Sequence, residues 1–211
     1  MNITETSELD AATLLAALRQ TPLRGFGCAR PYEHAELALV PDLDPGSLAP
    51  AQNYVLRPNL RRIAQLRAAL LGIGRDLFAL TGGLYLRTAE SGAELIPVIP
   101  PIIEQSHEPD GSTVLLISDG LHRVYSARQA GSTIAAIVVT RLPAEYPYYA
   151  YPLRGGWSQV TELAELPTGH QKKDYRQPEH YKALFRDFNA VLPGLQQQRD
   201  RTNPAHLTAG F

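Results

Sequence analysis

The sequence predicts an α+β fold in which helices pack around a small mixed sheet, and three observations support that prediction. The chain has 211 residues, 44% of them hydrophobic and 19% charged, so it can bury a substantial core without disulfides or metal ions. Two stretches have the apolar spacing of amphipathic helices, and several short β-branched runs next to Gly or Pro are typical of strands. Residues 113–140 predict a strand, a tight turn, a helix and a second strand in succession. We therefore expect one compact domain over residues 1–211.

Two helices are predicted in the N-terminal part, residues 1–94. The first covers residues 7–19, because Ser7 can cap it and its leucines have helical spacing. The second covers residues 58–71, where apolar side chains line one face, a proline lies in the first turn and glycines follow the last. The exposed face of the second helix carries basic side chains, which we interpret as a solvated surface or, as the alternative, the lining of a groove: Arg61, Arg62 and Arg67.

Strands are predicted on both sides of that second helix. Residues 35–40 form one candidate, which ends at a proline. Residues 77–80 and 84–87 predict two short strands joined by a Gly-Gly turn. Residues 96–104 are expected to be extended, because their prolines exclude a helix and their β-branched side chains favour a strand.

The central unit, residues 95–142, gives the most regular prediction. Residues 113–118 predict a buried strand that runs directly into an Asp-Gly pair. A helix follows over residues 121–130, and Gly131 ends it as a left-handed C′ residue. Residues 134–140 are almost uniformly apolar, which predicts a second buried strand of a mixed sheet.

The C-terminal extension, residues 143–211, is rich in Tyr, Pro and Gly and has no regular period at its start. A short helix is predicted over residues 178–190, and the polar tail from residue 196 is expected to fray. Basic side chains at Lys172, Lys173 and Arg176 are interpreted as a solvated surface. The tyrosines can stack on a base or, in the interpretation we favour, pin this segment to the core: Tyr146, Tyr148, Tyr149 and Tyr151.

Charge and cysteine content exclude several classes of protein. The formal net charge of −1 gives no global attraction to nucleic acid or anionic lipid, so nucleic-acid binding would need a local patch. The single cysteine, Cys28, excludes an internal disulfide framework and a cysteine-based zinc cluster, and it suits a reducing compartment. The first residues lack the basic start of a signal peptide, and no apolar run can span a bilayer. We expect a cytoplasmic protein without a membrane partner, and the sequence leaves its oligomeric state open.

One five-residue segment, Asp119-Gly120-Leu121-His122-Arg123, carries recognisable chemistry. Gly120 permits a tight strand-to-helix turn, and the helix that follows presents free backbone N–H groups and the positive end of its dipole. Arg123 adds a fork of donors suited to phosphate oxygens, and His122 is a further donor. Asp119 can cap the helix, hold a metal ion or accept a proton from a substrate hydroxyl, and the last two roles belong to phosphoryl transfer.

The order of motifs around this segment resembles the ParB/sulfiredoxin-like superfamily. The matching pieces are a Pro-Pro-Ile-Ile-Glu run at residues 100–104, a strand leading into the Asp-Gly-Leu-His-Arg turn at 119–123, a helix that ends at Gly131, and the strand at 134–139. The resemblance covers about residues 95–141 and implies a ParB/sulfiredoxin-like core. It also implies that the turn and the helix N-terminus bind nucleotide phosphates through Gly120, Leu121, His122 and Arg123.

Departures from the family patterns separate its branches. Sulfiredoxins need a cysteine directly before the His-Arg pair, and here that position is Leu121. Segregation proteins carry a Glu-Arg-Arg type turn and a helix-turn-helix domain, neither of which the sequence has. The ADP-dependent free-serine kinases match the motif best. Their catalytic glutamate lies upstream of the Pro-Pro segment, where Glu33 and Glu36 are the candidates, and we choose Glu36.

The resemblance therefore implies a nucleotide-dependent phosphotransferase. Its nucleotide would be ATP, ADP or CTP, and its acceptor a small hydroxyl-bearing molecule. The cofactor that the resemblance implies is Mg²⁺ held by Asp119, with Asp119 and Glu36 as catalytic residues. The alternative is a non-catalytic nucleotide-sensing or DNA-associated module, which needs only the phosphate cradle.

Other polar residues receive plainer interpretations. Glu104 follows an apolar run, and we expect it to be the first solvent-facing residue of its strand. Ser126 has no nucleophile-elbow glycines around it. The remaining histidines have no metal-ligand spacing, which argues against a zinc site: His34, His107, His170, His180 and His206.

Overall fold

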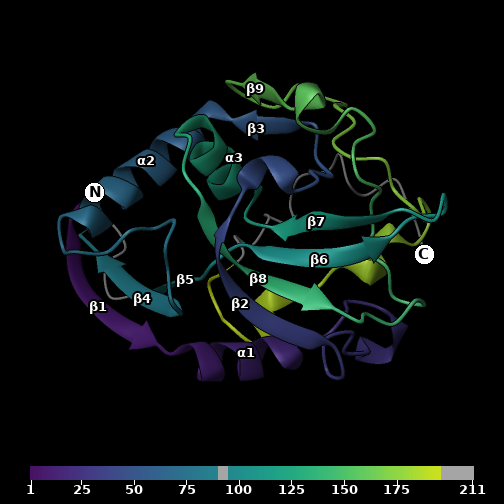
Figure 1. Cartoon of the computed structure of the whole chain (residues 1–211), viewed down its shortest axis with the longest axis horizontal. Coiled ribbons are helices and arrows are strands. Elements are labelled where there is room, and N and C mark those ends of the chain that lie inside the picture. Colours follow the sequence, from purple (N-terminus) through teal and green to yellow (C-terminus); the bar gives the residue numbers. More distant parts are fainter. Residues whose placement is uncertain (90–94, 196–211) are drawn as a thin grey trace.

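The computed structural model describes residues 1–89 and 95–195, and it has the α+β architecture that the sequence predicts (Figure 1). Its centre is a four-stranded mixed sheet in the order β2 (Glu36–Leu43), β8 (Ile134–Thr140), β6 (Ile102–His107) and β7 (Thr113–Asp119). Strands β6 and β8 are parallel, whereas the two outer pairings are antiparallel.

The two faces of this sheet are covered by different parts of the chain. Helix α3 (Leu121–Gln129) and helix α2 (Arg57–Leu71) pack on one face, and α1 (Ala11–Arg19) and the C-terminal extension pack on the other. Neighbouring residues of β6 point to opposite faces, as the two-residue period of a strand requires, so Ile103 joins the first core and Ile102 the second. The sheet is thus a middle layer with an apolar core on each face.

Two smaller sheets complete the fold. Strand β4 (Gly83–Thr88) pairs antiparallel with β1 (Ile3–Leu9) and with β5 (Ile96–Val98), which leads through Pro100-Pro101 into β6. Strand β3 (Tyr54–Leu56) pairs in parallel with β9 (Thr161–Leu163) and continues directly into α2. Short 3₁₀ turns connect the elements: Phe26–Cys28, Pro45–Ser47, Gly156–Gln159, Tyr181–Leu184 and Phe188–Ala190.

The N-terminal predictions are partly confirmed. Helix α1 begins only at Ala11, because Asp10 is its cap and accepts a 2.9 Å hydrogen bond from the Thr13 N–H, whereas Ser7 lies in strand β1. The prediction of a strand over 77–80 is wrong. That segment is a turn, in which the Asp76 carboxylate accepts a 3.0 Å hydrogen bond from the Phe78 N–H.

The predictions for the central unit are confirmed, with small changes of boundary. The extended run 96–104 is divided between β5 and β6, and the predicted strands at 113–118 and 134–140 correspond to β7 and β8. The predicted helix at 121–130 corresponds to α3, and Gly131 follows it with a φ of 60°. The helix predicted at 58–71 and the strand at 35–40 are also present, as α2 and β2.

The helix predicted over 178–190 is wrong, because two 3₁₀ turns replace it. Arg186 lies between these turns, and its backbone bridges to Leu23 while its guanidinium donates to three backbone carbonyls. These contacts hold the segment against the sheet, and its buried residues Leu184, Arg186 and Phe188 have a period of two instead of a helical period. The tail from residue 196 lies outside the described residues. No helix in the described part of the chain is long and apolar enough to cross a membrane.

Candidate functional site

The turn between β7 and α3 brings the predicted five-residue motif together. Asp119 is the last residue of β7, and Gly120 is the N-cap of α3 in a left-handed conformation with a φ of 86°. A Cβ atom at Gly120 would lie 2.9 Å from the Pro101 Cβ and 3.0 Å from Arg123 Nη2. Both the backbone angle and the space therefore require glycine at this turn.

The N-terminus of α3 has no side-chain cap among the described residues. Gly120 offers none, and the Asp119 carboxylate accepts from the Arg123 side chain instead of from a backbone N–H of the first turn. The first backbone N–H groups of a helix have no partner within the helix, and the dipole places partial positive charge beside them. Of the three roles considered for Asp119, simple capping is the one that this geometry does not use.

The Arg123 side chain extends back toward Ile99 and Asp119. Its Nη1 donates to the Ile99 carbonyl, and its Nη2 donates to Asp119 Oδ2 at 3.3 Å. The two side chains of this ion pair are 12% and 28% exposed. Burial lowers the pKa of the Arg123 guanidinium from its ordinary value, and the Asp119 carboxylate partly offsets that effect. A guanidinium stays charged in proteins and has five N–H donors, so these two contacts leave part of the fork available.

His122 has a different place from the one expected of a phosphate donor. Its Nε2 accepts a 3.0 Å hydrogen bond from the backbone N–H of Leu56, the N-cap residue of α2. Burial lowers the pKa of His122 to about 4, so the ring is neutral near pH 7. The His122 side chain therefore joins the starts of two helices.

Glu36 is not brought to this turn. Asp119 pairs with Ile102 across the sheet, Ile102 with Ile137, and Ile137 with Leu39. Glu36 lies three residues further along β2, on the opposite edge strand of the sheet. Three strand spacings alone separate the two edges by about 14 Å.

The local contacts of the upstream glutamates are those of surface residues. Glu36 is exposed and forms a 3.0 Å ion pair with Arg141. Glu33, the other candidate, is exposed in the turn before β2. Neither glutamate shares a contact with Asp119 in the described part of the chain.

Glu104 contradicts its prediction, because it is fully buried instead of facing solvent. Its two carboxylate oxygens accept hydrogen bonds from Arg186 Nε at 3.0 Å and Nη2 at 2.8 Å, and Oε1 also accepts from the Tyr32 hydroxyl at 2.6 Å. Burial lowers the pKa of Arg186, but Glu104 and Tyr32 together outweigh it and the pKa is raised. For Tyr32, burial and then Glu104 raise the pKa well above its ordinary value.

The basic residues of the C-terminal extension are also more enclosed than predicted. Lys173 donates to the hydroxyls of Tyr148 at 2.7 Å and Tyr149 at 2.5 Å. Arg176 forms a 2.6 Å ion pair with Glu108 in which neither side chain is more than 8% exposed. The solvated surface predicted for Lys173 and Arg176 is therefore wrong. The prediction that the tyrosines pin this segment is confirmed for Tyr148, which is buried in the core.

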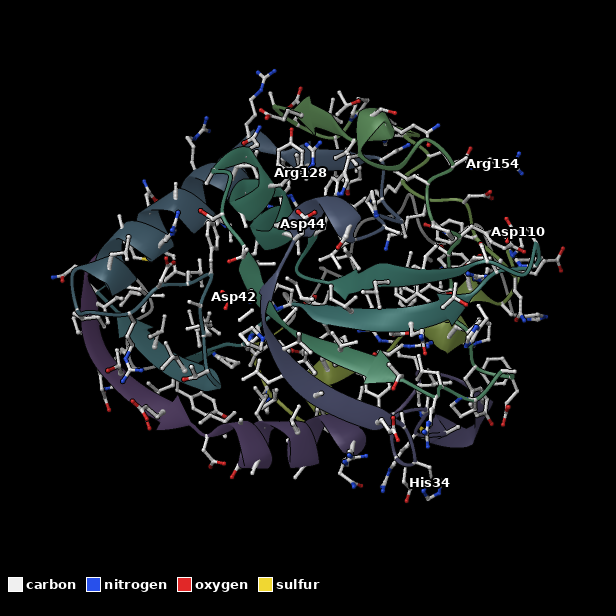
Figure 2. All side chains as sticks on the ribbon, viewed as in Figure 1. His34, Asp42, Asp44, Asp110, Arg128 and Arg154 are labelled. Carbon is white, nitrogen blue, oxygen red and sulfur yellow. The ribbon has the colours of Figure 1, made fainter. Side chains whose placement is uncertain are left out.

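Asp119 is the one candidate metal ligand from the motif. Among the described residues, no group of three or more His, Cys, Asp or Glu side chains could hold a metal ion. Mg²⁺ commonly takes one or two protein carboxylates together with substrate phosphates and water, so a single aspartate fits an ion that arrives with a nucleotide. His34 is exposed at the rim of the molecule, far from α3 (Figure 2), and His206 lies outside the described residues.

The contacts that Tyr148 and Arg186 make beside this turn were not predicted from the sequence. Tyr148 donates a 3.3 Å hydrogen bond to the Ser118 carbonyl, one residue before Asp119, and it contacts the Arg186 guanidinium with its ring. The C-terminal extension therefore supports the strand that carries the turn. The only signal in the sequence is an arginine inside an apolar segment, Leu184-Phe185-Arg186, and that pattern names no partner.

Comparison with known proteins identifies a family. A family model described as the ParB CE domain matches residues 13–161, well over half of the chain. The matched range extends from α1 to the start of β9 and includes the whole four-stranded sheet and the β7–α3 turn. No curated protein and no solved structure matches the chain.

Proposed function

The chain belongs to the ParB CE domain family, and we propose that it binds nucleotide phosphates at the β7–α3 turn and transfers a phosphoryl group to a small hydroxyl-bearing molecule. One observation carries this proposal: α3 begins at a left-handed glycine with no side-chain cap among the described residues. Such an N-terminus offers backbone N–H donors and a favourable dipole to a phosphate group. ATP, ADP and CTP are the nucleotides to test.

The Asp119–Arg123 pair supports a site that changes partner on binding. Its single 3.3 Å contact is longer than a good charge-assisted hydrogen bond, and both side chains are partly exposed. A phosphate group can offer Arg123 two oxygens in place of one, which favours exchange. Binding would then release the Asp119 carboxylate beside the phosphates.

The released carboxylate has two chemically distinct uses. Asp119 can hold Mg²⁺ against the phosphates, and the ion would supply charge neutralisation there. Alternatively, Asp119 accepts the proton of the acceptor hydroxyl. The oxygen of that hydroxyl then bonds to the terminal phosphorus, and the bond between that phosphorus and the rest of the nucleotide breaks. One carboxylate serves one of these roles at a time, so a transferase of this design needs a second group for the other.

That requirement favours a second candidate function, nucleotide sensing without transfer. Glu36 lies on the opposite edge strand, and Glu104 is held by Arg186 and Tyr32, so neither supplies the second carboxylate at the turn. A sensor needs only binding and a change of contacts at Asp119 and Arg123.

Two measurements separate these functions. Calorimetric titration with ATP, ADP and CTP, each with and without Mg²⁺, tests for the phosphate site. Transfer of labelled phosphate from the nucleotide that binds to free serine and to other small hydroxyl compounds tests for catalysis. Binding together with transfer supports the transferase, whereas binding without transfer supports the sensor. If none of the three nucleotides binds under either condition, the proposed phosphate site is refuted.

A further inference from the structure

A groove between α2 and α3 is separate from the β7–α3 turn in its lining residues. Its volume is about 670 Å³. Leu60, Ile63 and Leu71 of α2 and Phe78 contribute apolar surface, and Ser126 and the end of α3 lie across from them. None of the five residues of the Asp119–Arg123 motif lines it.

The wall formed by α2 is an open helix face. Arg57, Arg61, Ala64, Ala68 and Leu71 follow one another at helical spacing, line the groove and are exposed. The alanines leave room for another backbone to approach closely, as small residues do between packed helices. Along α2 the stripe from residue 57 to residue 71 is about 21 Å long at 1.5 Å per residue. That length suits a helix of about 14 residues better than a compact ligand.

The two ends of the stripe differ in character. At one end, the guanidinium groups of Arg57 and Arg61 form no hydrogen bond or ion pair with the part of the chain that the structure describes. At the other end, Leu71 is 52% exposed, and the neighbouring Ile73 is 48% exposed. An occupant that matches both ends carries acidic side chains at one end and large apolar side chains at the other.

The charges around the groove add to this preference. Residues 57–71 contain four arginines and no acidic residue. Arg67 is already neutralised by Asp76 at 2.8 Å and covers the ring of Phe78. The one acidic lining residue, Glu162, accepts hydrogen bonds from Tyr125 at 3.0 Å and Gln129 at 2.7 Å on α3. Tyr125 and Gln129 are neutral, so Glu162 keeps its negative charge, but the two guanidiniums of Arg57 and Arg61 outnumber it. The balance of charge is therefore positive at the N-terminal end of α2, where the helix dipole has the same sign.

We propose that this groove binds an acidic amphipathic helix of a partner protein. Its acidic residues would lie against Arg57 and Arg61, and its apolar residues would pack along the alanines toward Leu71 and Phe78. The apolar lining argues against nucleic acid, which relies on many phosphate contacts to basic side chains. This binding site does not depend on nucleotide binding at the β7–α3 turn.

A displayed peptide library tests the proposal directly. The library holds 16-residue helical peptides with random apolar residues at positions i, i+3, i+4 and i+7, and with Glu, Gln or Lys allowed elsewhere. It is selected on the full chain. The expected binders carry Glu near one end and large apolar residues at the other, because those groups match Arg57, Arg61 and Leu71.

Matched variants locate the binding. Arg57→Glu together with Arg61→Glu should weaken a selected peptide by about tenfold or more, and a peptide with Lys in place of Glu should regain binding to that double variant. The control is Arg62→Glu, which makes the same change of charge on α2 outside the groove lining. Ala64→Tyr should block the groove, whereas Gln65→Tyr should not. Nucleotide binding should be the same in all four variants.

Several outcomes would overturn the proposal. One is a library without enriched sequences, and another is a set of binders that are indifferent to Ala64→Tyr and to the double arginine variant. A duplex or single-stranded DNA oligonucleotide that binds and is lost in the double variant would indicate a nucleic-acid surface. Fluorescent fatty acids or aromatic phosphates that bind and are excluded by Ala64→Tyr, in the absence of peptide binding, would indicate a small-molecule pocket.

Discussion

Two carboxylate–arginine pairs in this molecule use the same chemical groups in opposite ways. Glu104 and Arg186 meet through two hydrogen bonds, at 3.0 and 2.8 Å, and their side chains are at most 2% exposed. Asp119 and Arg123 meet through one contact of 3.3 Å, and their side chains are 28% and 12% exposed. The first pair fastens the C-terminal extension to the central sheet. The second lies at a helix N-terminus where a ligand can compete for it.

The comparison shows that geometry and burial, more than residue type, separate a structural pair from a candidate site. Inside the protein, an unpaired charge carries a large desolvation penalty, so both partners must stay. Arg186 also satisfies three backbone carbonyls, and Glu104 also accepts from Tyr32. Asp119 has no comparable set of partners, because the hydrogen bonds of its carboxylate in the described part of the chain are limited to Arg123. The two pairs should therefore respond differently to substitution.

The largest effect is expected for Arg186→Leu. This change leaves Glu104 charged and buried without its main partner, so the free energy of unfolding should fall by about 3–5 kcal/mol. Urea denaturation followed by circular dichroism measures the loss. The control is Arg24→Leu, whose ion pair with Asp187 is 3.7 Å long and partly exposed, and which should cost no more than about 1 kcal/mol. Equal losses of unfolding free energy in the two variants would show that the buried Glu104–Arg186 pair stabilises the fold no more than an exposed pair does.

A smaller effect concerns His122, which positions the start of α3 against α2. Its folded-state pKa of about 4 lies below the ordinary value of 6.5, so the unfolded chain binds the proton more readily between these two pH values. Stability should therefore fall as the pH is lowered from 6.5 to 4, by on the order of 3 kcal/mol from this residue.

The matched variant is His122→Gln, which can still accept the hydrogen bond from Leu56 but does not titrate. The difference in unfolding free energy between wild type and this variant, measured from pH 4 to pH 7, isolates the histidine from the carboxylates. A His122→Gln profile parallel to that of the wild type would contradict the role given to this side chain.

The smallest expected effect is the difference in stability between alanine substitutions at two left-handed glycines, Gly131 and Gly120. Gly131 has a φ of 60° and nothing within 4 Å of an added Cβ, so Gly131→Ala should cost about 1–2 kcal/mol from backbone strain alone. Gly120→Ala adds a 2.9 Å approach to Pro101 and should cost about 1 kcal/mol more. Thermal unfolding of both variants gives the difference. A smaller loss at Gly120 than at Gly131 would mean that the turn can relax, and that its shape is not fixed.

The sequence predicted the central unit well, because its local signals and its tertiary contacts agree. The uniformly apolar strand at 134–140 and the glycine after α3 each have one favourable structure. The failures lie where distant contacts decide. The segment 178–190 has helical spacing, but Arg186 is held by carbonyls 39 and 40 residues away, and local periodicity contains no information about them.

The candidate site was predictable in its position and less so in its contacts. The motif itself indicated a tight turn at Gly120 before a helix, and Gly120 makes that turn in a left-handed conformation. The sequence did not indicate that His122 would accept a hydrogen bond from the start of α2, or that Arg123 would donate to the Ile99 carbonyl. It also placed Glu104 in solvent, because a glutamate after an apolar run is usually exposed, and its partner Arg186 lies 82 residues away.

The central claim is that the Asp119–Arg123 pair opens to admit a phosphate group. Metal-free calorimetric titration with ATP, or with whichever of the three nucleotides binds best, tests it in wild type and two variants. Arg123→Ala should lose a charge-assisted contact worth on the order of 1.5–3 kcal/mol, which weakens affinity roughly ten- to a hundredfold. Asp119→Asn should bind as tightly as wild type or more tightly, because a competing carboxylate is gone.

Arg123 also donates to the Ile99 carbonyl, so Arg123→Ala can lose affinity because it folds less well. Thermal unfolding of each variant and the milder substitution Arg123→Lys serve as controls for that effect. The lysine keeps the charge and loses the fork, so its affinity should fall between those of wild type and Arg123→Ala. We expect weaker binding in the arginine variants and equal or tighter binding in Asp119→Asn if a phosphate group opens the Asp119–Arg123 pair. Weakened metal-free binding in Asp119→Asn, together with unchanged binding in Arg123→Ala, would contradict it.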